Sequence, residues 1–342
     1  MRALRLHRTC DLTVESTPLR DEEVDDPVPG PGEVLLDVAA CGICHTELDE
    51  IEGRTPPSRL PMILGHQVVG RVVDRGPDAT RHAVGDRLGV AWIHSACGRC
   101  DFCTRGLENL CPDFRGTGRD APGGYAERMV VHEDFAHTLP ESFDDAEIAP
   151  LLCAGAIGYR SLRLTGLENG QRLGLTGFGA SGQLTLRLVR ALHPEAEVYV
   201  FARREATHRL ARELGAAWAG TSRDVPPAPM DAVIDTTPVW VPILEALRHL
   251  RPSGRLVINA IRKETQDADR LVDLDYAEQL WMEKEIKSVA NVAREDVRGF
   301  LEHAGRYGIR AEFEELGFGD VNDALVALRR GAGRGAKVLR VD

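Results

Sequence analysis

Four cysteines that lie close together in the chain are the first feature with chemical potential. They follow a C-x2-C-x2-C-x7-C pattern, at Cys97, Cys100, Cys103 and Cys111. Four thiolates joined by short loops can surround one zinc ion as a tetrahedron, which leaves no position open for a substrate. The spacing therefore predicts a structural zinc site rather than four unrelated loop thiols. An iron–sulfur cluster also takes four cysteines, but nothing else in the sequence indicates electron transfer.

A glycine-rich turn is the second feature. Gly177, Gly179 and Gly182 form a G-x-G-x-x-G pattern between a strand predicted over 172–176 and a helix predicted over 181–192. Glycines at this spacing allow a tight turn, the close approach of a pyrophosphate and close packing of the helix on the strand. The start of the helix then supplies amides to the phosphates. Because a second strand follows the helix, the context favours a dinucleotide site over a glycine-rich turn without function.

The residues at the end of that second strand, predicted over 197–201, determine the preference for NAD or NADP. Many NAD-binding proteins place an Asp or Glu there to bind the ribose 2′-hydroxyl. Here the strand runs into Ala202, Arg203 and Arg204, and guanidinium groups suit a 2′-phosphate through charge-assisted hydrogen bonds. Alternatively, both arginines are solvated beside the next helix and Glu205 binds the ribose. We expect NADP(H) to be favoured over NAD(H).

A second candidate metal site is scattered along the chain. Its residues lie in the segments CGICHTELD at 41–49, GHQ at 65–67 and PLLCAG at 150–155. Two thiolates and one imidazole leave a zinc ion with an open fourth position, as a Lewis-acid site requires. The spacing does not decide between Cys41 and Cys44. It also allows Cys153 to be a small buried residue and His66 a loop histidine.

The elements that must position these residues fall into two kinds. Up to about residue 150, proline and glycine separate short strands, which we predict over 34–40, 67–73 and 84–92. From residue 151 strands and helices alternate, with strands at 172–176, 197–201, 231–235 and 255–259 and helices at 181–192, 205–214 and 241–250. This alternation predicts a doubly wound parallel sheet. In the C-terminal part we predict helices at 294–306 and 321–330 and a strand at 336–341.

Length and charge limit the possible functions. A chain of 342 residues is long enough for two domains, each with its own core. With 53 acidic and 42 basic residues the formal net charge is −11, which disfavours nucleic acid and anionic membranes as partners. No segment resembles a signal peptide or a membrane span. The eight cysteines are clustered, unlike those of a disulfide scaffold. We therefore expect a cytoplasmic protein with reduced thiols that bind metal.

Motifs along the whole chain stand in a characteristic order. They are CGICHTEL at 41–48, GHQVVG at 65–70, VGDRLGV at 84–90, WIHSACGRCDFC at 92–103, GGYAE at 123–127, PLLCAGAIGYR at 150–160 and GFGASG at 177–182. In order and spacing they resemble the zinc-dependent medium-chain alcohol dehydrogenases. The resemblance implies an α/β fold with a β-rich GroES-like catalytic domain over 1–150 and 288–342. A doubly wound parallel-sheet Rossmann domain over 151–287 is expected to bind the dinucleotide.

The resemblance also implies which residues hold metal. It makes Cys44, His66 and Cys153 the ligands of a catalytic zinc and leaves Cys41 without a metal. Together with the structural zinc at Cys97, Cys100, Cys103 and Cys111, it implies two zinc ions in each chain.

Other roles follow from the same resemblance. His45 is expected to contact the cofactor pyrophosphate, and Thr46 to accept the proton of the substrate hydroxyl. Glu47 stands where the family has a carboxylate that orients the zinc site. Trp92 matches a residue that lines the substrate pocket.

Two residues depart from the family pattern. Gln67 follows the zinc-binding histidine where the family commonly has Glu, so one negative charge beside the metal is missing. Asp49 stands where many relatives carry a histidine as the outer station of a proton relay. The ordinary pKa of Asp, about 3.9, is well below that of His, about 6.5. The route by which the proton leaves is therefore expected to differ.

The expected activity is hydride transfer between a primary or secondary alcohol, or its aldehyde or ketone, and NADP(H), in a homodimer or homotetramer. A polyol or sugar dehydrogenase of the same fold is the nearest alternative. The metal-ligand residues disfavour a zinc-free quinone or enoyl reductase. A zinc-loop protein that binds nucleic acid through residues 97–111 is disfavoured by Asp101, Glu108 and the acidic chain.

Overall fold

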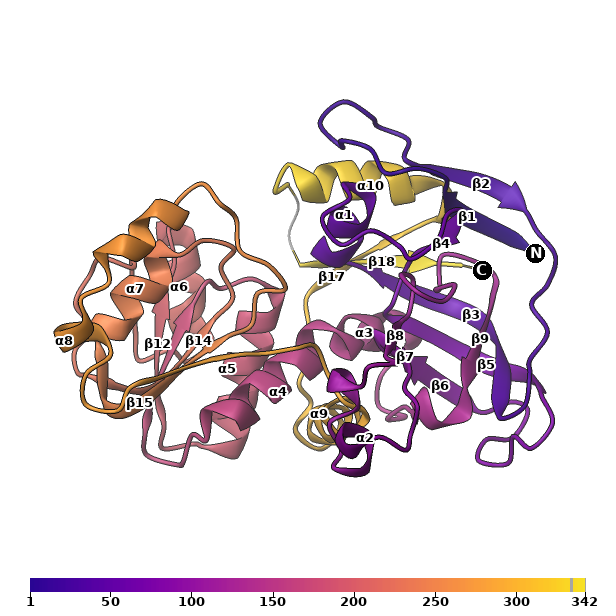
Figure 1. The fold of residues 1–342 in the computed structure, drawn as a ribbon. Helices are drawn as coiled ribbons and strands as arrows, with labels where there is room; N and C mark the ends of the chain where they lie inside the picture. Colours follow the sequence, from indigo (N-terminus) through magenta and orange to yellow (C-terminus); the bar gives the residue numbers. More distant parts are fainter. Residues whose placement is uncertain (333–334, 342) are drawn as a thin grey trace. The chain divides into compact units, whose positions relative to one another are not determined.

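The computed structural model describes residues 1–332 and 335–341, and the chain divides into two compact units. Unit 1 comprises Met1–Ala156 and Val292–Asp342, and unit 2 comprises Ile157–Asn291. Helix α4 (Ala154–Thr165) contains one of the boundaries. The colours of Figure 1 show that the N-terminal and C-terminal segments of the chain belong to the same unit.

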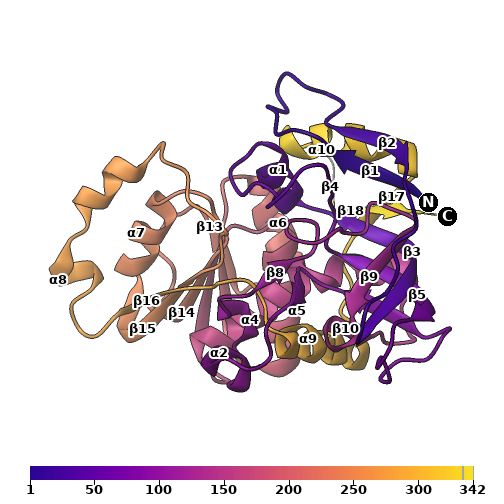
Figure 2. The same cartoon turned by 45° about the vertical axis from the view of Figure 1, so that its right-hand side comes forward.

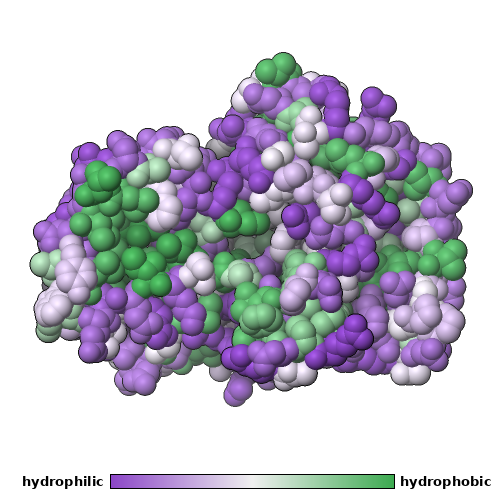
Figure 3. All heavy atoms as spheres, in the orientation of Figure 1, coloured by the Kyte–Doolittle hydropathy of each residue, from purple (hydrophilic) through white to green (hydrophobic). Residues whose placement is uncertain are grey.

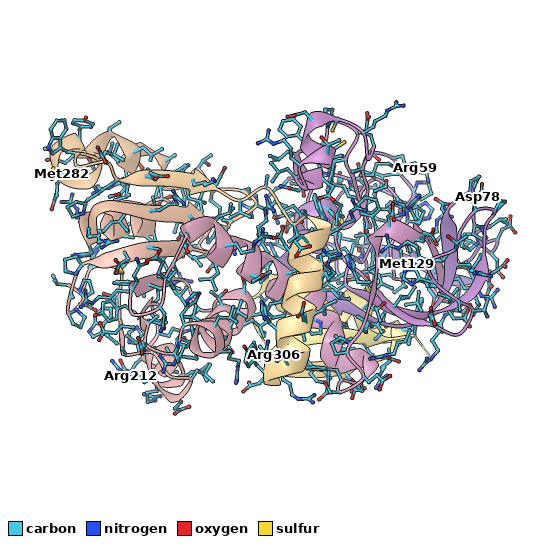
Figure 4. The ribbon with its side chains drawn as sticks, turned by 90° about the horizontal axis from the view of Figure 1, so that it is seen from below. Arg59, Asp78, Met129, Arg212, Met282 and Arg306 are labelled. Carbon is cyan, nitrogen blue, oxygen red and sulfur yellow. The ribbon has the colours of Figure 1, made fainter. Side chains whose placement is uncertain are left out.

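Unit 1 is a strand-rich body. Its strands are β1 (Arg2–Leu6), β2 (Leu19–Glu23), β3 (Glu33–Ile43), β4 (Met62–Ile63), β5 (Val68–Arg75), β6 (Arg87–Val90), β7 (Ile93–Ser95), β8 (Arg115–Gly116), β9 (Arg128–His132), β10 (Ala136–Thr138), β17 (Phe313–Leu316) and β18 (Ala336–Arg340). The largest sheet has the order β10-β6-β5-β3-β18-β17, with β9 also paired to β3. β3 is buried along most of its length because it pairs with β5, β9 and β18. Met129 of β9, labelled in Figure 4, is among its largest fully buried side chains.

Among the predicted strands of unit 1, β3 and β6 differ most in length from the sequence prediction. β3 continues past residue 40 to Ile43, because the backbone of residues 40–43 pairs with β18 near the other end of the chain. β6 is shorter than the predicted strand at 84–92. The chain turns at Gly85, whose φ is +96°, and the carboxylate of Asp86 accepts a hydrogen bond from the Ala83 amide at 2.8 Å. Neither distant pairing nor a local turn is visible in the apolar pattern.

The helices of unit 1 are short except near the C-terminus. They are α1 (His45–Ile51), α2 (Asp101–Thr104), η1 (Glu108–Leu110), η2 (Glu133–Phe135), α3 (Asp145–Ile148), η3 (Ala149–Leu152), α9 (Arg294–Tyr307), η5 (Phe318–Asp320) and α10 (Val321–Arg329). α9 buries Val297, Phe300 and Leu301 along one stripe. It ends at Gly308, whose φ of +64° is the left-handed conformation typical of helix ends. Phe300 lies against Gly155, where an added Cβ would approach its ring within 2.1 Å.

Unit 2 confirms the predicted doubly wound sheet. Its strands are β11 (Arg172–Thr176), β12 (Glu197–Phe201), β13 (Trp218–Gly220), β14 (Met230–Asp235), β15 (Leu250–Ile258) and β16 (Glu285–Ser288). They lie in the order β13-β12-β11-β14-β15-β16, and neighbouring strands are parallel. The helices are α5 (Ala180–Leu192), α6 (Glu205–Glu213), α7 (Val241–Arg248), η4 (Ala268–Asp273) and α8 (Tyr276–Gln279). Figure 2 shows α7 on one face of this sheet and α5 and α6 on the other.

The largest difference from the predicted bounds in unit 2 lies between α7 and β15. The helix predicted over 241–250 ends at Arg248, and β15 begins at Leu250 rather than at residue 255. The register of β14 and β15 shifts between Met230 and Ala232, and Ser253 has a φ of +61°. An irregular start of this kind hides the strand from a pattern of alternating side chains.

Unit 2 also exposes several large apolar side chains between residues 261 and 286. These are Ile261, Leu271, Val272, Tyr276, Trp281, Met282 and Ile286. Figure 3 shows hydrophobic residues gathered around α7 and η4, and Figure 4 labels Met282, which is 54% exposed. Over the described residues, no helix is both long and apolar enough to cross a bilayer.

His137 in β10 is expected to make unit 1 sensitive to acid. Burial, together with the nearby charges of Arg294, Arg298 and Arg81, lowers the pKa of His137 to about 3. An unfolded histidine titrates near pH 6.5, so the unfolded chain takes up the proton first and stability falls as the pH drops from about 6.5 towards 3. Between about pH 6.5 and pH 5, protonation of His137 in the unfolded chain lowers the free energy of unfolding by about 2 kcal/mol.

The variant His137→Gln cannot take up this proton. Between neutral pH and about pH 5, its free energy of unfolding should therefore fall by about 2 kcal/mol less than that of wild type. Urea unfolding at both pH values measures this difference. An equal loss in the two proteins would contradict the prediction.

Candidate functional site

Cys44, His66 and Cys153 lie together in unit 1. Their sulfur and ring-nitrogen atoms are all within 4.8 Å of one another. Cys44 Sγ is 3.7 Å from His66 Nε2. A tetrahedral zinc with bonds of about 2.3 Å to sulfur and about 2.1 Å to nitrogen would place these two atoms about 3.6 Å apart. The cluster therefore fits one zinc ion, to which it offers three protein ligands and a free fourth position.

The local backbone explains how three distant residues meet. Cys44 leaves β3 and caps the N-terminus of α1, where its sulfur accepts a hydrogen bond from the Thr46 amide at 3.4 Å. His66 stands between β4 and β5, directly after Gly65. Gly65 has a φ of +93°, and a Cβ there would lie 2.5 Å from the Tyr125 ring. Cys153 occupies the junction between η3 and α4.

Glu47 connects two members of this cluster. One carboxylate oxygen lies 2.6 Å from His66 Nδ1, and the other accepts a hydrogen bond from the Cys44 amide at 2.8 Å. Because Nδ1 is engaged, Nε2 is the nitrogen that faces Cys44. This is the carboxylate–histidine pairing that fixes the ring of a metal ligand. Gln67, the residue after His66, is also buried, and its amide nitrogen has no hydrogen-bond partner in the described part of the chain.

The ionisation of the Cys44 thiol and the His66 imidazole depends on the charges around them. The hydrogen bond with Cys153, together with burial, raises the pKa of Cys44 well above its ordinary value. Burial alone would lower the pKa of His66, but the negative charges of Glu47 and Cys44 raise it well above its ordinary value. A divalent metal ion is the partner that favours both ionised thiols and a neutral imidazole.

Three further predicted site residues, His45, Thr46 and Asp49, lie on α1. His45 is exposed at the first position of the helix, and Thr46 is half-buried. Asp49 is buried, and its carboxylate accepts a hydrogen bond from Arg54 Nε at 2.5 Å. Sequence reasoning missed this ion pair, although an arginine five residues further along was a visible signal.

Glu50 is a buried acid that sequence reasoning did not single out. Its side chain is 0% exposed, and within residues 1–332 and 335–341 neither carboxyl oxygen has a hydrogen-bond partner. Burial and the charge of Glu47 raise the pKa of Glu50 well above its ordinary value, which favours the neutral acid. Trp92, the expected pocket residue, is half-buried and packs against Phe114 with ring centres 5.2 Å apart and ring planes tilted by 33°. For Glu50, the available sequence signal was its position three residues after Glu47, which places both acids on the same face of the helix.

The four-cysteine array forms a second cluster in unit 1. The sulfur atoms of its members all lie within 4.8 Å of one another, at Cys97, Cys100, Cys103 and Cys111. The Cys97 and Cys103 sulfurs are 3.9 Å apart, and a tetrahedral zinc with bonds of about 2.3 Å places sulfurs about 3.8 Å apart. Backbone amides of Arg99 and Cys100 lower the pKa of Cys97 to about 6. These thiols therefore also fit one zinc ion, and no fourth position remains open.

A partly buried ion pair attaches this loop to α9. Glu108 is 4% exposed, and its Oε1 lies 2.8 Å from both Nε and Nη2 of Arg294. Arg294 also stacks over the ring of Phe135, with its guanidinium carbon 5.0 Å from the ring centre. The loop is thereby joined to a helix that is nearly 200 residues further along the chain.

The glycine turn of unit 2 has the backbone that its pattern predicts. Gly177 has a φ of +83°, and a Cβ there would lie 2.4 Å from Thr236 Oγ1. Gly182 packs against the turn, where a Cβ would lie 3.0 Å from the Gly177 carbonyl. A Cβ at Gly179 would meet nothing within 4 Å, and this residue caps α5 without a side-chain hydrogen bond. The open space at Gly179 and the helix N-terminus together fit a pyrophosphate.

Ala202, Arg203 and Arg204 follow the end of β12. Both arginines are exposed, and neither forms an ion pair within the residues that the structure describes. Glu205 is held by His208, whose Nδ1 lies 3.2 Å from its carboxylate. The acid that could have bound a ribose therefore has a partner on its own helix, and the guanidinium groups remain available to an anion.

The chain is similar to alcohol dehydrogenases along almost its entire length. Residues 30–141 match the alcohol dehydrogenase GroES-like domain. Over 333 residues the chain is 42% identical to a probable alcohol dehydrogenase of Mycobacterium tuberculosis (strain CDC 1551 / Oshkosh). The alignment covers 96% of this chain and 94% of that protein. The chain belongs to the medium-chain alcohol dehydrogenase family. The predicted family is thus confirmed.

Solved structures of alcohol dehydrogenases extend the similarity to the whole fold. A cinnamyl alcohol dehydrogenase of Sorghum bicolor matches with a TM-score of 0.82 and 27% identity, over 99% of this chain and 97% of that one. A cobalt- and zinc-bound thermostable alcohol dehydrogenase from Pyrobaculum aerophilum matches with a TM-score of 0.84 and 25% identity, over 100% and 99% of the two chains. The chain is therefore an oxidoreductase with the GroES-like and Rossmann parts of this family.

Proposed function

We propose that the chain transfers a hydride between a primary or secondary alcohol, or its aldehyde or ketone, and a nicotinamide dinucleotide. The observation that carries this proposal is the Cys44–His66–Cys153 cluster, because its donor set and spacing are those of a zinc site with an open position. The glycine turn at 177–182 supports dinucleotide binding on unit 2. The relatives named as alcohol dehydrogenases support the same reaction class.

Two zinc ions in each chain are part of the proposal. Cys44, His66 and Cys153 would hold one, and the four cysteines at 97–111 would hold the other. When bound, the first ion supplies a Lewis acid for the substrate oxygen, and the dinucleotide supplies or accepts the hydride. The second has four protein ligands and contributes to stability alone.

Residues of α1 carry the proton chemistry in this proposal. Thr46 is half-buried two positions after Cys44, and its hydroxyl accepts the proton of the substrate hydroxyl. Glu47 holds the His66 ring so that Nε2 faces the metal position. The ion pair between Asp49 and Arg54 favours a role for Asp49 in positioning the helix.

NADP(H) is the proposed cofactor. Arg203 and Arg204 stand directly after β12, where the adenosine ribose is expected. Their exposed guanidinium groups suit the two negative charges of a 2′-phosphate, whereas Glu205 is held by His208. Because NADPH serves mainly as a reductant, we propose that aldehyde reduction is the working direction.

Steady-state kinetics with each cofactor tests both the reaction and the cofactor preference. Wild type should oxidise alcohols and reduce aldehydes with a higher kcat/KM for NADP(H). Replacing Arg203 and Arg204 together with alanine should lower that kcat/KM by about a hundredfold, because each lost charged hydrogen bond costs about 1.5 kcal/mol. The value for NAD(H) should stay within about twofold. Arg209→Ala, an exposed arginine on α6, is the matched control. A clear preference of wild type for NAD(H) would refute the proposed cofactor.

We also propose a cytoplasmic homodimer or homotetramer. β16 is at the end of the sheet order of unit 2, and its side chains are all exposed. The free edge of such a strand can pair with another strand, and the exposed Tyr276, Trp281 and Met282 precede it in the sequence. None of the eight cysteines, which all lie among the described residues, forms a disulfide, as is usual in a reducing compartment.

A further inference from the structure

A buried ion pair lies at the carboxyl edge of the sheet in unit 2. Asp235 is the last residue of β14 and is 0% exposed, and Lys263 follows β15 with a side chain that is 10% exposed. Lys263 Nζ is 2.5 Å from Asp235 Oδ2, and it also donates to the carbonyls of Thr237 at 2.6 Å and Val239 at 3.2 Å. These acceptors, all within the described residues, match the three protons of an ammonium group.

The other oxygen of Asp235 is joined to the strand that carries the glycine turn. Asp235 Oδ1 accepts hydrogen bonds from the hydroxyls of Thr176 at 2.5 Å and Thr237 at 2.8 Å. Thr176 is the last residue of β11 and immediately precedes Gly177. The Thr236 amide donates to the Thr176 carbonyl at 2.8 Å. The ion pair is thus part of the support of the turn that is proposed to hold the pyrophosphate.

Further bonds tie the segment after β15 to the segment after β14. The Glu264 amide donates to the Pro238 carbonyl at 2.6 Å. The Asp267 carboxylate accepts hydrogen bonds from the amides of Trp240 and Val241, at 2.9 Å each, where α7 begins. Segments 236–241 and 259–267 therefore form one cross-linked structure, which we call the loop pair.

The register of the sheet places the loop pair beside the glycine turn. Thr176 of β11 stands opposite Asp235 of β14, which stands opposite Ile258 of β15. On the other side, Thr176 stands opposite Phe201 of β12. A dinucleotide with its pyrophosphate at the turn and its adenosine beyond β12 extends its nicotinamide half along β14 and β15. The loop pair lies at the ends of these two strands.

We propose that Lys263 and Asp235 are positioning residues that hold the loop pair in the arrangement that receives the nicotinamide half of the cofactor. This inference rests on the proposed dinucleotide binding. Lys263 is one of only four lysines among 42 basic residues. A planar guanidinium cannot direct three donors from one nitrogen, whereas an ammonium group can, and here three acceptors surround a single atom.

The test measures cofactor affinity separately from stability. Lys263→Met cuts the central tie, and Asp267→Ala cuts the outer tie without leaving a buried unpaired charge. Arg172→Met is the matched control, because Arg172 pairs with Glu197 at 2.8 Å at the amino ends of β11 and β12. For each variant, the dissociation constant of NADPH is measured by fluorescence quenching and the melting temperature without cofactor by calorimetry. KM for NADPH and for the alcohol, and kcat, are measured alongside.

If the loop pair is ordered in about a tenth of the Lys263→Met molecules, the dissociation constant for NADPH rises about tenfold. KM for NADPH should rise with it, while KM for the alcohol stays within about twofold, and Asp267→Ala should show a smaller rise of about threefold. Arg172→Met should leave cofactor affinity unchanged.

A lower melting temperature with unchanged NADPH affinity would overturn the proposal, for it would show a purely structural ion pair. Should Lys263→Met fail to fold, unchanged affinity in Asp267→Ala overturns it equally. A wild type that binds no dinucleotide would instead refute the proposed function itself.

Discussion

Replacing Cys44 with serine should reduce kcat/KM for alcohol oxidation by about a thousandfold or more, because a bound Lewis acid contributes several kcal/mol of transition-state stabilisation. The Cys44 sulfur is one of the three ligand atoms at the proposed metal position, and it also caps the N-terminus of α1. Serine can replace the cap but is a poor zinc ligand at neutral pH. The variant should therefore stay folded and lose one zinc ion from each chain, as determined by metal analysis and calorimetry beside the kinetic assay.

Cys41→Ser is the matched control for this variant. Cys41 is also a buried thiol in the same motif, but it lies within β3, in the ladder with β5 and β18. Its sulfur faces Gly65 and Gly124 instead of the metal cluster. We expect Cys41→Ser to keep both zinc ions and activity within a few-fold of wild type. Loss of zinc from Cys41→Ser, together with its retention by Cys44→Ser, would contradict the assignment of ligands.

Replacing Cys103 with serine should have the largest effect on stability. Cys103 is a buried member of the four-sulfur cluster, and burial raises the pKa of its thiol to about 12 in the absence of metal. Metal binding is what favours its thiolate, and loss of a structural metal is among the few changes that cost about 4 kcal/mol or more. We expect the variant to lose the zinc of this loop, melt at a lower temperature and become sensitive to proteolysis within residues 97–111.

The effect should spread from the loop to α9 through the ion pair between Glu108 and Arg294. Hydrogen exchange at the start of α9 should therefore accelerate in Cys103→Ser. Cys10→Ser is the control, since Cys10 is half-buried and belongs to neither sulfur cluster. If Cys103→Ser unfolds and exchanges like Cys10→Ser, the structural role of the zinc loop is refuted.

Sequence periodicity predicted four of the strands of unit 2, whereas the edge strands β13 and β16 were not predicted. The strands predicted over 172–176 and 197–201 have those bounds in β11 and β12, because each is a short apolar run between turn-forming residues. Unit 1 was less predictable. The extension of β3 depends on pairing with β18, nearly 300 residues away, and no local pattern contains that information. The turn at Gly85 shortened β6 for a local reason that alternation of side chains does not show.

Within the candidate site, residue types were more predictable than partners. The array at 97–111 is local, so its spacing alone indicated a metal cluster, and the structure brings its sulfurs together. Choosing Cys44 over Cys41 required either the family resemblance or the end of β3, where the chain leaves the strand. Lys263 remained unnoticed because its acceptors lie at 235–239, more than 20 residues away. The burial of Glu50 likewise follows from tertiary packing.

The central claim is that alcohol oxidation occurs at a metal held by Cys44, His66 and Cys153. Its most direct test is to titrate zinc into metal-depleted wild-type protein while recording both bound zinc and alcohol oxidation. The account predicts saturation at two zinc ions for each chain, with activity proportional to occupancy of the three-ligand site. Full activity in protein that holds one zinc ion for each chain, bound at the four cysteines alone, would contradict it.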